Sequence, residues 1–146
     1  YLNGQFYFTK YAMPLLKRSQ NASIICISSV AGRLGYGYRT PYSATKWAII
    51  GLVKSLAIEL GPSGIRANAL LPGIVEGPRM QKVIADRAAA LELSYQDMEQ
   101  DYLKKISLRR MVSAQDVADQ AIFLASPLGR NISGQAISIC GNVETL

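Results

Sequence analysis

Three apolar segments limit most strongly how this chain can fold. They read SIICIS (23–28), IRANALL (65–71) and GQAISIC (134–140). Short, largely continuous apolar runs that are bounded by turn residues are typical of strands buried on both faces, as in a parallel sheet. We therefore expect three buried strands. We also expect the thiols of Cys26 and Cys140 to be buried in two of them rather than joined in a disulfide.

Segments with helical spacing alternate with these strands. Apolar side chains recur at helical spacing in residues 5–18, where Pro14 should kink the helix or end its first half. A second helix is expected over 41–60, ended by the turn sequence GPSG, and a third over 113–126. This alternation predicts an α/β fold, a doubly wound parallel sheet covered on both faces. In such sheets, ligands bind beyond the carboxyl ends of the strands.

Residues 74–113 differ from the rest of the chain. They are charged, rich in alanine and without a strand signal. We expect them to form one or two mobile helices that act as a lid. The segment ends at Ser113, which together with Asp116 three residues later forms a capping pattern for the following helix.

The composition excludes several classes of function. The 146 residues fit a single domain, and the absence of histidine excludes His-based nucleophilic triads and most catalytic zinc sites, so we expect no metal. No apolar run reaches the roughly 18 residues that a membrane-spanning helix needs. The first residues, YLNGQFYFTK, do not resemble a signal peptide. We therefore expect no membrane association and a cytoplasmic location.

The net charge of +6 raises the question of a nucleic-acid partner. The basic residues, however, are scattered over several segments and interleaved with acidic ones. Nucleic-acid surfaces more often show clustered basic residues together with exposed aromatic ones. We interpret most of these charges as solvated surface and expect no nucleic-acid partner.

The segment PYSATKWAII (41–50) carries a candidate chemical pair. Tyr42 and Lys46 are four residues apart, so they share one face of a helix. An ammonium about 4 Å from a phenol favours the phenolate by roughly 4 kcal/mol at an effective dielectric near 20, which suits acid–base chemistry near neutral pH. The alternative is an ordinary helix start, with Pro41 in its first turn and Tyr42 half-buried. The spacing alone leaves both interpretations open.

In its wider context, the chain resembles the short-chain dehydrogenase/reductase family. The matching stretches are ISSVAG, YSATK, LAIELGPSGIRANALLPGIV and ISGQAIS, which occur in the family's order and cover nearly the whole sequence. The resemblance implies a Rossmann-like enzyme that uses NAD or NADP to interconvert a secondary alcohol and a ketone by hydride transfer. It implies that Ser29 polarises the substrate oxygen and that Tyr42 transfers the proton. Lys46 would favour the ionised tyrosine and hold the nicotinamide ribose.

The resemblance also implies contacts with the cofactor. The backbone around Pro72, Gly73 and Val75 would flank the nicotinamide, beside Tyr42 and Lys46. The substrate would be a small alcohol or carbonyl compound.

Specificity and assembly are likewise expectations. We expect the Gly32–Thr40 loop to contribute to substrate specificity, with Tyr36 and Tyr38 either forming an aromatic wall or packing locally in a turn. By the same resemblance, the protein would be a homo-oligomer, a tetramer or a dimer. Residues 1–18 and 41–60 would line a contact between its subunits.

The chain departs from the family pattern at several positions. The family's catalytic asparagine aligns with Tyr1, which implies either an altered proton relay or a truncated start, and we favour truncation. Gly77 stands where many relatives carry a threonine that contacts the cofactor. The sequence CGN at residues 140–142 replaces the family's DGG.

The largest departure is the lack of a glycine-rich phosphate loop and of an acidic residue ending a second strand. We therefore expect residues 1–146 to be the C-terminal part of one Rossmann-fold domain, with its N-terminal dinucleotide-binding half absent from the chain. The alternative to an oxidoreductase is a non-catalytic relative or fragment that serves as an oligomerisation module.

Overall fold

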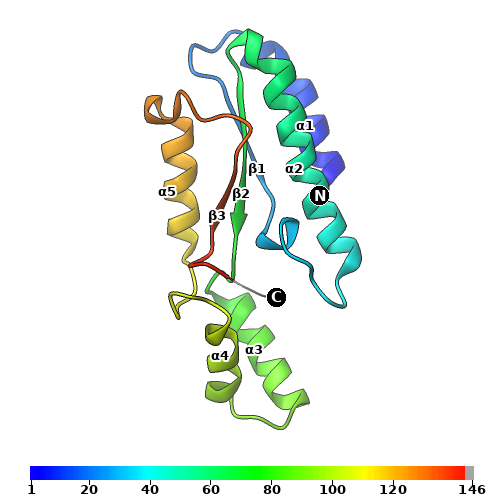
Figure 1. Ribbon diagram of the computed structural model, residues 1–146, viewed down its shortest axis with the longest axis vertical. Coiled ribbons are helices and arrows are strands. Elements are labelled where there is room, and N and C mark those ends of the chain that lie inside the picture. The colour runs from blue at the N-terminus through cyan, green and yellow to red at the C-terminus, as the bar shows by residue number, and fades with distance from the viewer. Residues whose placement is uncertain (144–146) are drawn as a thin grey trace.

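The fold is organised around a parallel sheet of three strands. The computed structural model describes residues 1–143. Strands β1 (Ser23–Ile27), β2 (Arg66–Pro72) and β3 (Ala136–Ile139) pair in parallel in the order β1-β2-β3. All three carboxyl ends therefore lie at one edge of the sheet, the lower edge in Figure 1.

Helices cover both faces of this sheet, as the alternating pattern predicts. Helices α1 (Leu2–Leu16) and α2 (Thr40–Leu60) lie on one face and α5 (Ala114–Ala125) on the other (Figure 1). Of the two effects expected at Pro14, a kink or an end of the helix, the second does not occur, because α1 continues to Leu16. Pro14 lies in the last turn of α1, where the proline ring removes only one hydrogen bond of the helix.

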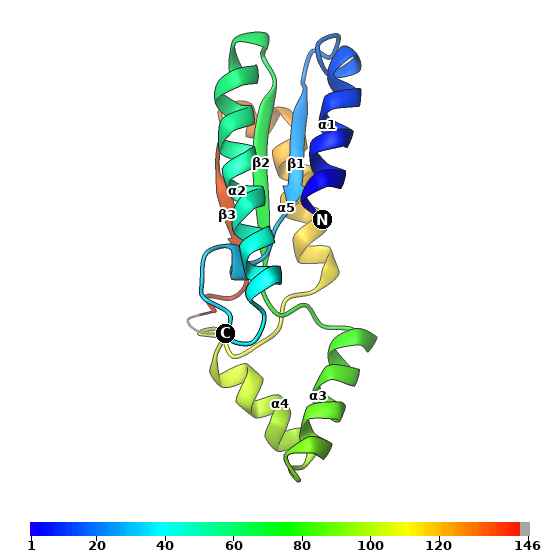
Figure 2. The same ribbon diagram turned by 90° about the vertical axis from the view of Figure 1, so that its right-hand side faces the viewer.

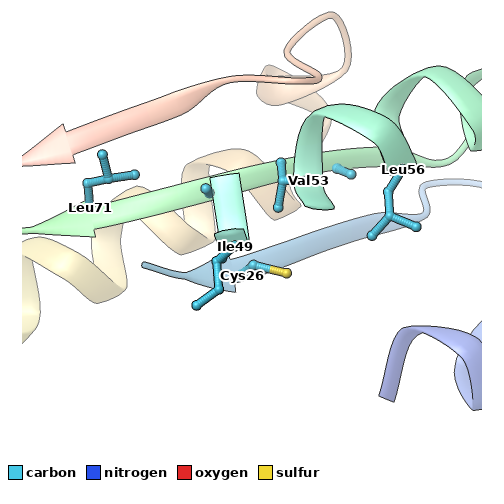
Figure 3. Packing of buried hydrophobic residues seen from close by; sticks show 7 residues of the cluster. Cys26, Ile49, Val53, Leu56 and Leu71 are labelled. Carbon is cyan, nitrogen blue, oxygen red and sulfur yellow. The ribbon is translucent and has the colours of Figure 1, made fainter. Parts of the chain in front are cut away.

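The main core lies between α2 and the sheet. Ile49, Val53 and Leu56 project from successive turns of α2 onto Cys26 of β1 and Leu71 of β2 (Figure 3). The spacing of the three α2 residues places them on one face of the helix. Burial of Cys26 raises the pKa of its thiol.

The prediction for the cysteines is confirmed for one of the two. Cys26 is buried, whereas Cys140, which directly follows β3, is half-buried, and both thiols are free. Every residue of β3 is likewise only half-buried, because β3 is an edge strand of the sheet, so the expectation of a buried third strand is wrong.

Two polar side chains are buried in β2, and both are hydrogen-bonded. Arg66 donates to the carbonyls of Leu124 (2.7 Å) and Gly129 (2.9 Å), which fastens the end of α5 to the sheet. The Asn68 amide donates to the carbonyl of Ile132 (2.8 Å). Buried polar groups need such partners, so these residues fix the loops that precede β3.

The segment predicted as a lid forms two helices. Helices α3 (Pro78–Ala90) and α4 (Tyr95–Lys104) project beyond the carboxyl edge of the sheet (Figure 2). They pack on each other through Ile84, Ala88 and Met98. Among the described residues, no helix is long and apolar enough to cross a membrane.

The capping pattern at the end of the lid is confirmed. The Ser113 side chain accepts a hydrogen bond from the backbone N–H of Asp116 (3.1 Å), and the Asp116 carboxylate accepts one from the Ser113 backbone N–H (2.7 Å). This reciprocal pair satisfies two backbone donors at the start of α5.

Candidate active site

Ser29 lies just past the carboxyl end of β1. It caps the short 3₁₀ helix η1 (Val30–Gly32), and its hydroxyl oxygen accepts a hydrogen bond from the backbone N–H of Ala31 (3.2 Å). Its side chain is half-buried. The hydroxyl therefore occupies a defined position at the edge of the sheet where ligands bind in this kind of fold.

The turn that carries Ser29 is tied to the start of α2. The Ser28 hydroxyl donates to the backbone carbonyl of Lys46, and the Ser43 hydroxyl donates to the carbonyl of Ala31, each at 2.8 Å. A Cβ atom at Gly32 would lie 2.6 Å from the Ser28 Oγ and 2.7 Å from the Lys46 carbonyl oxygen. Glycine at position 32 is thus what allows η1 to approach α2 so closely.

The residue after η1 connects this turn to the far strand. The guanidinium of Arg33 donates to the backbone carbonyl of Ala136 (2.6 Å) and to the hydroxyl of Ser138 (3.1 Å), both in β3. The loop that follows β1 therefore also contacts β3.

Tyr42 and Lys46 share one face of α2, as their spacing predicts. The Lys46 Nζ lies 5.6 Å from the centre of the Tyr42 ring. Tyr42 is half-buried, whereas Lys46 is only 5% exposed. Burial lowers the pKa of Lys46, because removal from water disfavours the charged ammonium.

The ammonium of Lys46 has a backbone partner. Its Nζ donates to the carbonyl of Ile27 at the end of β1 (3.2 Å), which also accepts a hydrogen bond from the Gln5 amide of α1 (3.3 Å). An ammonium has three N–H donors, so one bond to Ile27 leaves donors for the hydroxyl groups of a ligand. In this respect, the residues present fit a ribose.

Two further aromatic rings contact Tyr42. The rings of Tyr1 and Tyr36 meet it edge-to-face, with centres 6.3 Å and 6.4 Å away. Tyr38, in contrast, is fully exposed and adopts a left-handed backbone conformation (φ 60°). Tyr36 alone of the two loop tyrosines packs against the candidate site, so the predicted wall of Tyr36 and Tyr38 is not formed.

The candidate cofactor-contacting residues follow the carboxyl end of β2. Pro72 is the last residue of β2, and the backbone N–H of Gly73 donates to the carbonyl of Ile139 in β3 (2.8 Å). A Cβ atom at Gly73 would lie 2.6 Å from that of Cys140. Val75 forms a parallel bridge with Val112, which joins the start of the lid segment to its end.

The structure thus brings Tyr42 and Lys46 together and places Ser29 on the adjoining turn. Pro72, Gly73 and Val75 follow the neighbouring strand at the same edge of the sheet. This arrangement holds a phenol, an ammonium and a hydroxyl on adjoining elements, and a phenol beside a cation can serve as a general acid or base.

Sequence reasoning missed three parts of this arrangement. These are the carbonyl of Ile27, the contact of the Tyr1 ring with Lys46 and the close approach at Gly32. The glycine offered a signal, because glycine is often used where two backbones approach closely. The other two depend on elements that the chain brings together only on folding.

Comparison with known proteins gives a consistent result. The model of the family described as Enoyl-(Acyl carrier protein) reductase matches residues 1–142. The chain is 34% identical over 142 residues to the 3-oxoacyl-[acyl-carrier-protein] reductase FabG of Thermotoga maritima. That alignment covers 97% of this chain and 53% of FabG.

Solved structures share the fold. YwfH, an NADPH dependent reductase involved in bacilysin biosynthesis, superimposes with a TM-score of 0.89 at 26% identity, over 99% of this chain and 56% of YwfH. A 3-oxoacyl-[acyl-carrier protein] reductase with bound NAD from Brucella melitensis gives a TM-score of 0.79 at 31% identity, over 99% and 49% of the two chains.

These matches cover almost the whole of the chain but only part of each relative. The chain spans about half the length of the curated relatives that it matches. The family model, the curated relative and the solved structures all match over nearly the whole chain. The chain belongs to the short-chain dehydrogenase/reductase family.

Proposed function

We propose that the protein containing this chain is an NAD(P)-dependent oxidoreductase that interconverts a secondary alcohol and a ketone. One observation carries the proposal: the buried ammonium of Lys46 lies 5.6 Å from the ring of Tyr42, at the carboxyl edge of a parallel sheet. A buried cation beside a phenol is an arrangement suited to proton transfer rather than to packing alone.

In this proposal, Tyr42 donates the proton to the carbonyl oxygen during reduction and accepts it from the alcohol during oxidation. The nearby ammonium of Lys46 stabilises the negative charge that the phenol oxygen acquires when the proton leaves. The hydroxyl of Ser29 donates a hydrogen bond to the substrate oxygen and orients it. The dinucleotide, when bound, supplies or accepts the hydride.

The residues proposed to hold the dinucleotide lie around this pair. Lys46 would bind the ribose hydroxyls with the N–H donors that Ile27 does not use. The backbone of Pro72, Gly73 and Val75 would flank the nicotinamide, because these residues follow the end of β2 beside the site. The relatives do not favour NAD over NADP, since one is NADPH dependent and another has NAD bound.

The rest of the domain is also a proposal. We infer that residues 1–146 form the C-terminal part of one Rossmann-fold domain, with a lid over about 74–113. The coverage of about half of each relative supports this. We further infer a cytoplasmic location.

The second candidate function is an oligomerisation module, and one observation favours it. Helix α1 presents four exposed aromatic side chains, Phe6, Tyr7, Phe8 and Tyr11. Exposed aromatic surface of this kind is typical of protein–protein contacts. A homo-oligomeric enzyme would also use α1 and α2 as its subunit contact, so a lack of catalysis is what would distinguish the non-catalytic module.

The experiment that tests catalysis uses the full-length protein. Turnover is measured with NAD(H) and NADP(H) against a panel of alcohols and ketones for the wild type, Tyr42→Phe, Lys46→Met and Ser29→Ala. We expect each variant to lose about 10²-fold or more in kcat, because each removes a group that acts in proton transfer or orientation. Tyr38→Phe, at a fully exposed tyrosine, should keep wild-type turnover. Unchanged turnover in Tyr42→Phe would defeat the proposed mechanism.

The oligomer is tested by light scattering of the same full-length protein. Phe8→Glu places a charge on the exposed face of α1 and should reduce the oligomer to a smaller species. Ile122→Glu, at another exposed apolar side chain, on α5, should leave the mass unchanged. The same mass for all three proteins would exclude α1 as the contact.

A further inference from the structure

The first residue of the chain lies in the candidate site. The Tyr1 ring centre is 4.7 Å from Lys46 Nζ, closer than the 5.6 Å between that atom and the Tyr42 ring centre. The Tyr1 and Tyr42 rings meet edge-to-face, at an interplanar angle of 87°. Tyr1 thus contacts both members of the pair that the proposed function relies on.

The position of Tyr1 is set by the helix that follows it. Tyr1 precedes the first turn of α1 and makes no side-chain cap to that helix. In the next turn, Gln5 donates to the Ile27 carbonyl, the same acceptor that Lys46 uses. This shared acceptor joins the first turns of α1 to the ammonium, and Tyr1, at the N-cap of α1, lies beside Lys46 with the rest of its side chain exposed.

The contact of the Tyr1 ring with Lys46 offsets part of the hydration that the buried ammonium has lost. Lys46 is 5% exposed, and its described polar partner is one backbone carbonyl. A cation in this situation has lost much of its hydration, and the face of an aromatic ring offers negative potential in return. The ring does so without a carboxylate, which would compete with the phenol for the ammonium charge.

We propose that Tyr1 is a positioning residue of the site: the ring of Tyr1 holds the Lys46 ammonium in its charged form and braces the Tyr42 ring. This rests on the proposed function, in which Lys46 acts through Tyr42. In the family pattern this position carries a polar asparagine, so the aromatic ring replaces a hydrogen-bonding group by a cation–π contact. The hydroxyl of Tyr1 is not part of the role.

The test compares variants at position 1 in the full-length protein. Tyr1→Phe keeps the ring and should retain wild-type kcat and KM. Tyr1→Leu keeps apolar bulk but removes the ring, and should lower kcat by about 2- to 30-fold, the range that a cation–π contact covers. The alkaline limb of the kcat–pH profile of Tyr1→Leu should move to lower pH, because the Lys46 ammonium loses its proton more readily without the ring. Tyr38→Leu, at the fully exposed loop tyrosine, should leave both kcat and its pH dependence unchanged.

A second measurement does not depend on activity. The Lys46 ammonium is titrated by NMR in isotope-labelled protein, with Lys46→Met used to assign its signal. Tyr1→Leu should lower the pKa of Lys46 and Tyr1→Phe should leave it unchanged. The proposal would be overturned if Lys46 had the same pKa in the wild type and in Tyr1→Leu. It would also be overturned if Tyr1→Phe lowered kcat as much as Tyr1→Leu. If the shift is seen in a protein without dehydrogenase activity, the contact holds and the proposed function fails.

Discussion

The hydroxyl of Ser28 donates a 2.8 Å hydrogen bond to the backbone carbonyl of Lys46. This bond links the end of β1 to α2 at the residue whose ammonium reaches back to Ile27 of the same strand. The backbone and the side chain of Lys46 are therefore both held by β1 and the residue after it. A site built on two bonded elements keeps its geometry better than one built on a free loop.

The first prediction concerns the close approach at Gly32. Gly32→Ala should destabilise the protein by about 1–3 kcal/mol, because its Cβ would overlap Ser28 Oγ and the Lys46 carbonyl. Gly35→Ala is the matched control: no atom lies within 4 Å of its added Cβ, and its stability should be unchanged or slightly higher. Urea unfolding measures both. Equal stability of the two variants would show that η1 does not pack on α2 in this way.

The second prediction is a pH dependence at Lys46. Burial lowers the pKa of Lys46 below its ordinary value of 10.5. Between the folded and unfolded pKa values, the unfolded chain binds the extra proton, so the wild type gains stability as pH rises. The unfolding free energy of the wild type minus that of Lys46→Met should therefore increase as pH rises from the lowered folded pKa towards 10.5. Other titrating groups are common to both proteins and cancel, so a flat difference would contradict the burial of the ammonium.

The third prediction concerns the buried arginine of β2. Arg66→Met should lower the unfolding free energy by about 3 kcal/mol, because the carbonyls of Leu124 and Gly129 lose a charged donor in a buried place. Arg79→Met, at an exposed arginine on α3, provides the control and should change stability by less than about 0.5 kcal/mol. Thermal unfolding that ranks the two variants equally would argue against the role of Arg66 in fastening α5.

The fourth prediction concerns the cap of α5. Ser113→Ala should cost about 1 kcal/mol, since it removes the acceptor for the Asp116 N–H. Ser55→Ala, at an exposed serine within α2, should not destabilise, because alanine is the better helix former. Chemical unfolding of both variants decides whether the capping box is needed.

The capping pair of Ser113 and Asp116 also makes the stability of the protein depend on pH in the acid range. Hydrogen bonds from the backbone and the hydroxyl of Ser113 lower the pKa of Asp116 below 3.8. The cap is therefore complete above pH 3.8 and is lost as pH falls through the folded pKa. Asp116→Asn should therefore lose less unfolding free energy than the wild type as pH falls below 3.8. If the two proteins lost the same unfolding free energy at acid pH, the ionised carboxylate of Asp116 would not stabilise the protein.

The strands and helices could be predicted because each needs only local information. The apolar runs marked β1, β2 and β3 to within two residues at each end, and the spacing of Tyr42 and Lys46 placed both on one helix face. The two buried polar residues of β2 could not be predicted in their roles. Asn68 bonds to Ile132, 64 residues away, and such partners are known only when the chain has folded.

The sequence predicted the chemical groups of the candidate site, but not the contacts that hold these groups in place. Ser29, Tyr42 and Lys46 stood out by residue type and order, whereas the contact of Tyr1 with Lys46 joins two helices that a sequence pattern treats separately. Of the two alternatives left open for Tyr36 and Tyr38, the aromatic wall is not formed, since Tyr38 has a left-handed backbone and a side chain exposed to solvent. Alternation of tyrosine and glycine carries no information about that backbone geometry.

The two hydrogen bonds from Arg33 to β3 limit which residues of the loop can move around the site. The turn before Arg33 is bonded to α2 through Ser28 and Ala31, and α2 begins at Thr40. A ligand that enters by displacing this loop can therefore move only the residues between these two anchors. Tyr36, which lies in that short interval and touches Tyr42, would then swing with each opening and couple substrate entry to the packing of the phenol.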